Sequence, residues 1–307
     1  MFLFSFPLSA VFARLRLIVP SVICFPQENI TITNNTAQFN GGGIVVEYGN
    51  PNLSNIIISD NYSGGSGGGL YCWHGEPGLT EIEIDNNIAL HYGGGLYFRD
   101  ATPNLQNIIV SNNIASQSSG GGIYFWNSST NLTNTTITGN SAPIGGGIRC
   151  ENCNVGLVNT ILWNDYPEEI NIYSGSVNAI YSDIQGGWEG EGNINLNPQF
   201  TNPMISDYTL RENSPCIDAG TADLNGDGVE DITDYLGSAP DMGAYEYMGD
   251  ILPGDINDDG LINVLDVVAL VNIVLTGGDY NTAGDLNSDG VNNVLDVVFL
   301  VNIILNG

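Results

Sequence analysis

The sequence predicts an all-β fold, a parallel β-helix with about 26 residues per coil, followed by a small α-helical calcium-binding module. Two observations predict this arrangement. A triple glycine followed by an apolar residue recurs every 25 to 27 residues, and the last sixty or so residues contain two near-identical copies of one segment. We therefore expect an apolar N-terminal segment at 1–25, a β-helix at 26–248 and the helical module at 249–307.

The repeat appears in three residue types that share one period, which is typical of solenoid folds. The triple glycines begin at Gly41, Gly67, Gly93, Gly120 and Gly145. The accompanying series are the leucines Leu53, Leu79, Leu105, Leu132 and Leu157, and the asparagines Asn35, Asn61, Asn87, Asn113, Asn140 and Asn164.

Each repeat contains two short runs with the character of strands. In the Ile-Glu-Ile of residues 82–84, the polar centre predicts that the isoleucines point inward and the glutamate outward. Such short strands can stack on their equivalents one coil away, at about 4.8 Å. The recurring asparagines can then hydrogen-bond along the stack. We expect one inward row to consist of Val46, Cys72, Phe98, Phe125 and Cys150.

The charge balance limits the class of partner. The chain has 34 acidic residues against five arginines and no lysine, with a formal net charge of -29. Because basic side chains dominate affinity for nucleic acids, we expect no nucleic-acid partner. Anionic membrane surfaces are disfavoured for the same reason, and we expect no membrane insertion after processing. The acidity fits solubility or calcium binding, and regularly spaced carboxylates would indicate the latter.

The five cysteines, an odd number with irregular spacing, predict no disulfide framework. Cys150 and Cys153 form a single CxxC without a second pair or a histidine at zinc spacing, so we interpret them as structural or incidental. Cys72 and Cys150 would lie about three coils apart, too far for a mutual disulfide. The pairing of the cysteines stays open.

The N-terminus allows two interpretations. Residues 1–25 are apolar and contain Val11-Phe12-Ala13, which ends in a small residue as a cleavage site would. The arginines follow the first apolar run, whereas a signal peptide has its positive charge before it. The segment is either a degenerate signal peptide or the product of a misplaced start site. A secreted, extracellular or bacterial cell-surface location is therefore inferred mainly from the C-terminal module.

Residues 254–275 and 284–305 are identical at 16 of 22 aligned positions. Each copy opens with the spacing of an EF-type calcium loop, in which oxygens at positions 1, 3, 5, 7, 9 and 12 surround the ion. The first loop would use Asp255, Asn257, Asp259, the carbonyl of Leu261, Asn263 and Asp266. The second would use Asp285, Asn287, Asp289, the carbonyl of Val291, Asn293 and Asp296.

A third segment has the same spacing, but no clean amphipathic helix follows it. Its ligands would be Asp223, Asn225, Asp227, the carbonyl of Val229, Asp231 and Asp234. We expect either a third calcium site here or a solvated acidic turn.

The duplicated loop, with one amphipathic stretch after each copy and Asp at position 12, resembles a type I dockerin. The resemblance implies a calcium-dependent partner, a cohesin domain on a scaffold or cell-surface protein. It also implies that loop positions 10 and 11 help to choose the partner. These positions hold Val264-Leu265 and Val294-Leu295, which are identical in the two halves, so two symmetry-related binding modes are expected.

The stretch after residue 164 contains phrases such as Ser-Pro-Cys-Ile-Asp-Ala-Gly at 214–220 and Asp-Met-Gly-Ala-Tyr-Glu at 241–246. It resembles the closing region of secreted bacterial right-handed parallel β-helix proteins. That broad group includes polysaccharide lyases, glycoside hydrolases and adhesins, so the resemblance implies a fold and leaves the activity open.

Two outward rows of aromatic and basic residues are expected on the β-helix, at Tyr71, Tyr97 and Tyr124, and at Trp73, Arg99 and Trp126. An exposed aromatic strip suits stacking against sugar rings. The simpler interpretation is that tyrosine and tryptophan favour strands and form ladders by stacking alone.

Three functions remain open for the β-helix: a carbohydrate-binding or adhesive arm, a polysaccharide-degrading lyase or hydrolase, and a purely structural surface protein. Hydrolysis needs a pair of facing carboxylates, and none repeats between coils. We therefore name no catalytic residue and favour a non-enzymatic arm. A polysaccharide is one of the partners considered for this arm. The sequence does not name a glycan.

Overall fold

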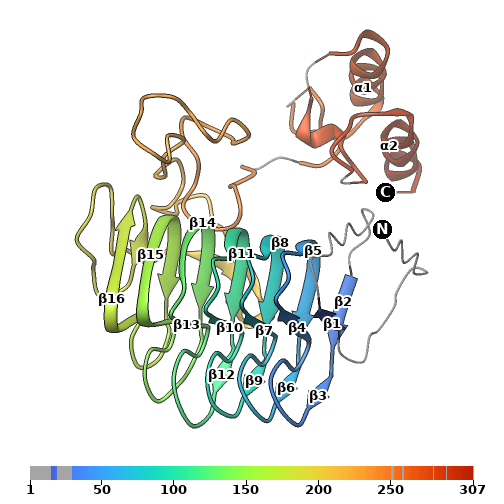
Figure 1. The fold of residues 1–307 in the computed structure, drawn as a ribbon. Coiled ribbons are helices and arrows are strands. Elements are labelled where there is room, and N and C mark those ends of the chain that lie inside the picture. Colours follow the sequence, from blue (N-terminus) through green and yellow to red (C-terminus); the bar gives the residue numbers. More distant parts are fainter. Residues whose placement is uncertain are drawn as a thin grey trace. The chain divides into compact units, whose positions relative to one another are not determined.

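A computed structural model describes residues 15–18, 30–249, 252–257, 259–278, 280–287 and 289–306 (Figure 1). The chain forms two compact units, 1–247 and 248–307. The suggested cleavage site at 11–13 lies outside the described residues. Within the apolar segment 1–25, Leu15–Ile18 forms strand β1, which pairs with β4 in parallel.

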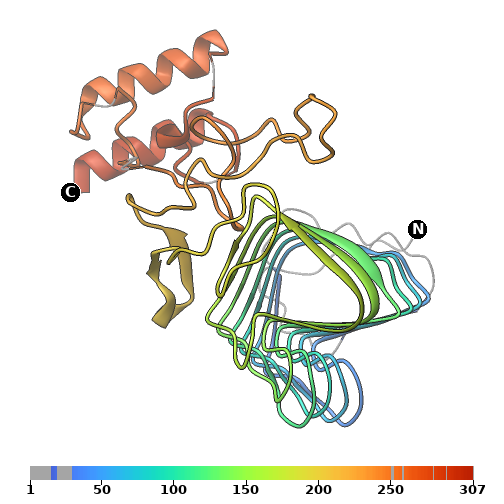
Figure 2. The same ribbon diagram turned by 90° about the vertical axis from the view of Figure 1, so that its left-hand side faces the viewer.

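The first unit is a parallel β-solenoid, and its coils are seen end-on in Figure 2. The first strand of successive coils is β4 (Ile44–Glu47), β7 (Leu70–Trp73), β10 (Leu96–Arg99), β13 (Ile123–Trp126) and the start of β15 (Ile148–Trp163). The second strand is β2 (Ile30–Thr33), β5 (Asn52–Ser59), β8 (Gly78–Asp85), β11 (Asn104–Ser111), β14 (Ser129–Thr138) and the rest of β15.

A short third strand completes the coil. It is β3 (Thr36–Ala37), β6 (Tyr62–Ser63), β9 (Ile88–Ala89) and β12 (Ile114–Ala115). All of these strands pair in parallel with their equivalents one coil away, as the period of about 26 residues requires.

The core consists of inward-facing rows that run along the solenoid. Val46, Cys72, Phe98, Phe125 and Cys150 are fully buried, and the rings of the two phenylalanines stack with centroids 5.5 Å apart. The predicted leucine row is buried as well. Each such side chain contributes roughly 1.5–3 kcal/mol of hydrophobic stabilisation. Glu83 is exposed between two buried isoleucines, so the predicted strand orientation is confirmed.

The cysteines of the described residues divide into a bonded pair and free thiols. Cys150 and Cys153 form a disulfide, while Cys72 and Cys216 are buried and free. The prediction that Cys72 and Cys150 do not pair is confirmed. Burial raises the pKa of the Cys72 thiol to about 12, which keeps it unreactive at neutral pH.

Each of the three consecutive glycines is required at the corner for a different steric reason. The first glycine adopts positive φ, for example 66° at Gly67. A Cβ on the second, Gly68, would lie 2.2 Å from the carbonyl oxygen of Gly94, and one on the third, Gly69, 3.2 Å from Nδ2 of Asn87. The corner therefore has no room for a side chain.

The asparagine ladder is present and buried. The Nδ2 of Asn61 donates to Oδ1 of Asn87 at 3.0 Å, and the same bond links Asn87 to Asn113. The final residue of the ladder differs from the prediction. Asp165 accepts from Asn140 at 2.9 Å, whereas Asn164 lies one position earlier, at a turn residue with φ 66°. The last position needs only an acceptor, and a carboxylate supplies one.

Asp165 forms a buried acidic pair with Glu169, whose Oε1 accepts from the backbone N–H of Asp165 at 3.2 Å. Burial, and then the neighbouring Glu169, hold the pKa of Asp165 well above its usual value; burial also raises the pKa of Glu169. Among the described side chains, the second oxygens of both carboxyl groups find no donor. A proton held by the pair supplies the missing donor.

We expect Asp165→Asn to stabilise the solenoid at alkaline pH. Because the pKa of Asp165 is raised in the folded protein, the stabilisation that its protonated form contributes is fully present below the ordinary pKa. This stabilisation is lost as the pH rises through the folded pKa. Asparagine needs no proton and can also donate a hydrogen bond. Thermal unfolding of the calcium-saturated protein at pH 5 and pH 8 should show a smaller pH-dependent change in midpoint for the variant. An unchanged difference between the two pH values would contradict the shared proton.

The solenoid ends with strands β16 (Ile170–Ile180) and β17 (Asp183–Ile184), which pair with β15. An antiparallel pair follows, β18 (Phe200–Asn202) and β19 (Asp207–Leu210), joined by the 3-10 turn Pro203–Ile205. A second buried cluster, containing Ile161, Tyr208 and Met242, attaches this closing region to the outside of the coils.

The second unit contains helices α1 (Val264–Thr276) and α2 (Val294–Asn306), with a 3-10 turn at Thr282–Gly284. Leu270 and Leu300, both fully buried, form its small core together with Ile256 and Ala283. Among the described residues, neither these helices nor any other is long and apolar enough to cross a membrane.

Candidate functional sites

The duplicated loops of the second unit have nearly the same internal geometry. In the first, Oδ1 of Asp255 accepts from the backbone N–H of Asp259 at 3.1 Å, and its Oδ2 accepts from Gly260 at 2.7 Å. Asp285 repeats both bonds at 3.1 and 2.8 Å. These contacts curl each loop around the carboxylate at position 1 and leave side-chain oxygens directed to its interior.

The aspartate at position 12 closes each loop. Asp266 accepts from the backbone N–H groups of Ile256 at 2.9 Å and Asn263 at 2.8 Å. The bond from Asn263 makes Asp266 part of a capping box at the start of α1, where the Asn263 side chain also accepts from the backbone N–H of Leu265 at 2.8 Å. Asp296 repeats the closing bonds, and both aspartates are fully buried.

The oxygens fit a calcium ion. In the second loop, carboxylate oxygens of Asp285, Asp289 and Asp296 all lie within 4.8 Å of one another. The hydrogen bond from Asn287 lowers the pKa of Asp289, which keeps that carboxyl group ionised. Several carboxylates held this closely repel one another unless a cation lies between them, and hard oxygen ligands select calcium.

The third loop, 223–234, has a similar start and a different end. Asp223 accepts from the backbone N–H groups of Gly226 at 2.7 Å and Gly228 at 2.8 Å. These bonds lower the pKa of Asp223, and the bond from Gly228 has the largest effect. Asp231, at position 9, accepts from Leu224 at 2.9 Å, which is the bond that position 12 makes in the other loops. The loop therefore closes at Asp231 instead of at Asp234.

The predicted partner-binding residues lie at the starts of the two helices and are exposed. Val264 and Leu265 are 65% and 58% accessible, and Val294 and Leu295 are 65% and 55% accessible. Val268 and Val298, one turn further on, are exposed as well. Each half thus presents the same apolar patch beside its calcium loop.

The tyrosine row on the solenoid stacks as predicted, but the prediction that it is exposed is wrong. Tyr71 and Tyr97 stack with centroids 5.2 Å apart, and Tyr97 and Tyr124 with centroids 5.4 Å apart. All three are only 5–6% accessible. Trp73 and Trp126 pack against the row, and the ring of Tyr92 lies with its centroid 5.0 Å from that of Tyr124 and 6.3 Å from that of Tyr97. These buried rings therefore offer no open face on which a sugar could stack.

The second row is half-buried, and we call Trp73, Arg99 and Trp126 the tryptophan–arginine strip. The strand register aligns the three residues on adjacent coils. The guanidinium carbon of Arg99 lies 4.1 Å from the ring centroid of Trp126 and 5.8 Å from that of Trp73, which is cation–π geometry. Glu47 and Glu151 continue the row at either end.

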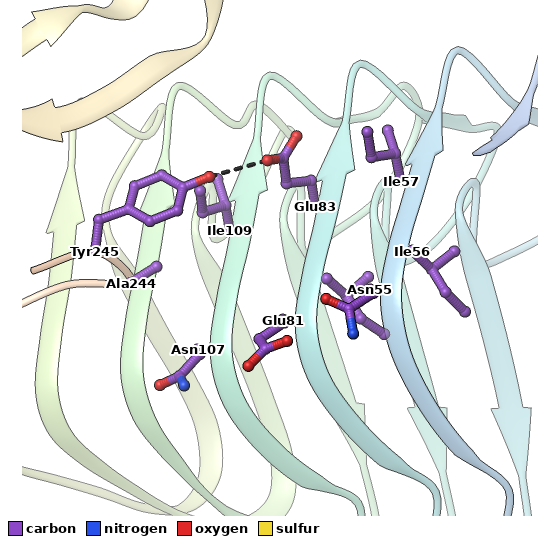
Figure 3. A pocket seen from close by; sticks show the side chains of 10 residues that line it. Asn55, Ile56, Ile57, Glu81, Glu83, Asn107, Ile109, Ala244 and Tyr245 are labelled. Atoms are coloured by element: carbon purple, nitrogen blue, oxygen red, sulfur yellow. Dashed lines mark hydrogen bonds between the residues drawn. The ribbon is translucent and has the colours of Figure 1, made fainter. Parts of the chain in front are cut away.

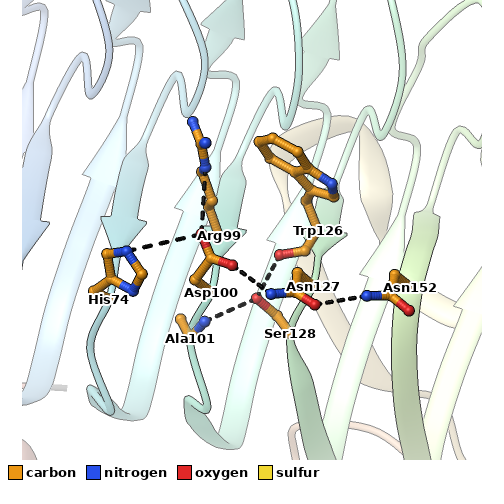
Figure 4. A network of polar contacts seen from close by, with 8 residues as sticks. All are labelled: His74, Arg99, Asp100, Ala101, Trp126, Asn127, Ser128 and Asn152. Atoms are coloured by element: carbon orange, nitrogen blue, oxygen red, sulfur yellow. Dashed lines mark hydrogen bonds and ion pairs between the residues drawn. The ribbon is translucent and has the colours of Figure 1, made fainter.

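A polar network borders the strip (Figure 4). Asp100 lies 3.4 Å from Nε of Arg99 and 3.9 Å from Nε2 of His74. It also accepts from Asn127, which in turn accepts from Asn152 at 2.6 Å. A hollow of about 310 Å³ beside it is lined by Asn50, His74, Gly75, Glu76, Asp100 and Thr102.

A second groove, of about 370 Å³, lies on the outer face of β5, β8 and β11 (Figure 3). Its sides include Glu81 and Glu83, and one end is formed by Ala244 and Tyr245. Tyr245 donates to Glu83 at 2.9 Å, and Ala244 is fixed by a bond from its N–H to Thr136 at 3.0 Å.

Several of these residues were not expected at a site. His74 and Asp100 follow the first strand directly, at turn positions with φ 52° and 50°, and their shared column is visible in the repeat alignment. Tyr245 is 162 positions from its partner Glu83, and no local pattern connects them.

Comparison with known proteins gives two matches. The family of the dockerin type I domain matches residues 253–305. The repeat of the Chlamydia polymorphic membrane protein matches residues 29–47, which contain most of the first described coil. No curated protein matches the chain. The chain is a parallel β-helix repeat protein with a C-terminal type I dockerin domain.

Proposed function

We propose that this is an extracellular, calcium-dependent docking protein, whose dockerin binds a cohesin-type partner and whose solenoid serves as a carbohydrate-binding or adhesive arm on the bacterial surface. The dockerin supports cohesin docking in a cellulosome-like context. The observation that carries the proposal is the pair of calcium loops, each followed by an exposed Val-Leu at the start of a helix.

The identical halves give a sharp test of docking. We expect Leu265→Asp alone to weaken cohesin binding by about twofold, because the other half still offers its patch. Leu265→Asp with Leu295→Asp should weaken binding by about 30-fold or more, as loss of central apolar contacts does. Titration calorimetry with a panel of purified cohesin domains measures both.

Leu275→Asp is the matched control, since Leu275 is 79% exposed at the far end of α1. It should leave the affinity unchanged. A loss from Leu265→Asp alone as large as the loss from the double variant would contradict two equivalent binding modes.

Carbohydrate binding is proposed for the tryptophan–arginine strip. Its support is the half-buried pair of indole rings around Arg99, bordered by the polar groups of His74 and Asp100 that can bond to hydroxyls. The buried tyrosine row would then only hold the strip in place.

We expect Trp126→Ala to weaken retention of the full protein on an insoluble polysaccharide by about tenfold, the loss of one stacked aromatic contact. Depletion of the protein from solution by a panel of insoluble glycans measures this retention. Tyr62→Ala removes an aromatic ring that is 38% exposed on the short-strand sheet and is the control. Equal retention of the two variants would exclude the strip.

A polysaccharide-degrading lyase or hydrolase carried into a cellulosome-like complex is the second candidate. The hollow that brings His74, Glu76 and Asp100 together favours it, since these groups can exchange protons with a substrate. Release of reducing ends or unsaturated products, with calcium and with chelator, distinguishes an enzyme from a binding or purely structural arm.

We also propose three calcium sites, two in the dockerin and one at 223–234. The third is supported by the way Asp223 and Asp231 hold the loop. Calcium titration of the full chain should give three equivalents, and Asp223→Ala should remove one while cohesin binding persists.

A further inference from the structure

The groove of Figure 3 lies on a different face of the coil from the tryptophan–arginine strip. The strip is on β7, β10 and β13, whereas the groove is on β5, β8 and β11. Two parallel rows line it: Asn55, Glu81 and Asn107 form one, and Ile57, Glu83 and Ile109 form the other. Each row takes one residue from each of three adjacent coils.

The closing region determines where the groove ends. The rows continue on later coils, but the segment at 243–245 covers them there, because Ala244 bonds to Thr136 and a Cβ on Gly243 would lie 2.8 Å from Ile161. Tyr245 reaches back to Glu83. The groove therefore stays open over β5 and β8, and the closing region, which buries Ile109 of β11, closes it at one end.

The chemistry of the lining selects the ligand. Carboxylate and amide groups offer hydrogen bonds to hydroxyls, while Ile57, which is half-buried, and the Tyr245 ring offer apolar contact. The Oδ1 of Asn107 is buried and, within the described residues, accepts no hydrogen bond. No arginine lines this groove, and the chain has a net charge of -29, so phosphate or uronate groups would be repelled.

The spacing of the rows fits an extended chain. Equivalent residues on adjacent coils are about 4.8 Å apart, which is close to the length that one pyranose unit adds to an extended polysaccharide. Figure 3 shows the Glu81 and Glu83 carboxylates directed to different parts of the groove, so they would contact separate hydroxyls and do not form one chelating cluster.

We propose that this groove binds an uncharged polysaccharide chain, laid along the solenoid axis with one sugar unit per coil. The site is separate from the strip and from the dockerin. The proposal rests on the proposed carbohydrate-binding function and adds to it a second site and a class of ligand.

The test is calorimetry and amide NMR of the full calcium-loaded protein with cellohexaose, xylohexaose, mannohexaose and hexagalacturonate. We expect at least one neutral hexasaccharide to bind and to shift the side-chain amide signals of Asn55 and Asn107. Because salt does not screen the binding of an uncharged ligand, its Kd should be the same in about 20 mM and about 500 mM salt. Hexagalacturonate should not bind.

Glu81→Gln should weaken binding about tenfold, the usual loss of a hydrogen bond to a charged group. Ile57→Trp, which places bulk in the groove from a half-buried position, should weaken it by about tenfold or more. Glu212→Gln makes the same charge change at an exposed position outside the groove and should have no effect.

Three results would overturn the site. One is binding of a neutral sugar with an affinity that neither groove variant changes. Such a result would contradict the groove and would still agree with sugar binding at the tryptophan–arginine strip. Another is no binding by any neutral hexasaccharide. The third is binding of hexagalacturonate as tightly as a neutral hexasaccharide. Cohesin affinity, measured on the same samples, shows separately whether the docking proposal holds.

Discussion

Asp296→Ala should abolish calcium binding in the second dockerin loop and unfold α2. The alanine removes one of three converging carboxylates and the acceptor for the N–H groups of Leu286 and Asn293. Losing a buried, paired charge costs about 3–5 kcal/mol, which corresponds to about 10²–10⁴-fold in Kd. Since the calcium free energy is also folding free energy here, helix content should fall with it.

Calcium calorimetry and ellipticity at 222 nm measure the two consequences. Asp296→Ala should lose one equivalent of calcium and cohesin affinity through that half, while Asp266→Ala with Asp296→Ala should lose all cohesin binding. Asp234→Ala is the matched control, because Asp231 makes the closing bond in the third loop. Undiminished calcium binding by Asp296→Ala would mean that position 12 is dispensable.

Asn87→Ala should destabilise the solenoid by about 3–6 kcal/mol. The amide of Asn87 donates to the carbonyl of Ile58 and to Asn113, and accepts twice from Asn61, all inside the coil. Alanine leaves several buried groups unpaired, at about 1–3 kcal/mol each. That is a large part of the stability of an ordinary domain.

Chemical denaturation, monitored by tryptophan fluorescence, measures the loss. Asn35→Ala is the control, because Asn35 is only partly buried and lies at the start of the described ladder, where it donates to Asn61. It should cost much less than Asn87→Ala. Equal costs for the two variants would show that position within the ladder does not matter.

The coil period, the inward rows and the calcium loops could be predicted because each depends on residues at fixed spacing. The ladder ended one residue away from its predicted position for a chemical reason. Matching by residue type selects Asn164, while the structure requires only an acceptor, which Asp165 provides.

The candidate surfaces were harder to predict. Alternation along a strand indicates which way Tyr97 points, but only its packing with Tyr92 and the neighbouring tryptophans shows that it is covered. The groove depends on Tyr245 reaching Glu83 across 162 positions, and on Ala244 bonding to Thr136 across 108. Such contacts follow from how the closing region packs on the coils, which no periodicity encodes.

The asparagine ladder has a direction. Each described amide donates toward the next coil, and the series ends on Asp165, a residue that accepts from its predecessor. An asparagine side chain both accepts from one coil and donates to the next, so it allows the series to continue. The aspartate side chain has no amide donor, so the series ends there. Evolution could lengthen such a protein by inserting whole coils anywhere before that acid without altering how the stack finishes.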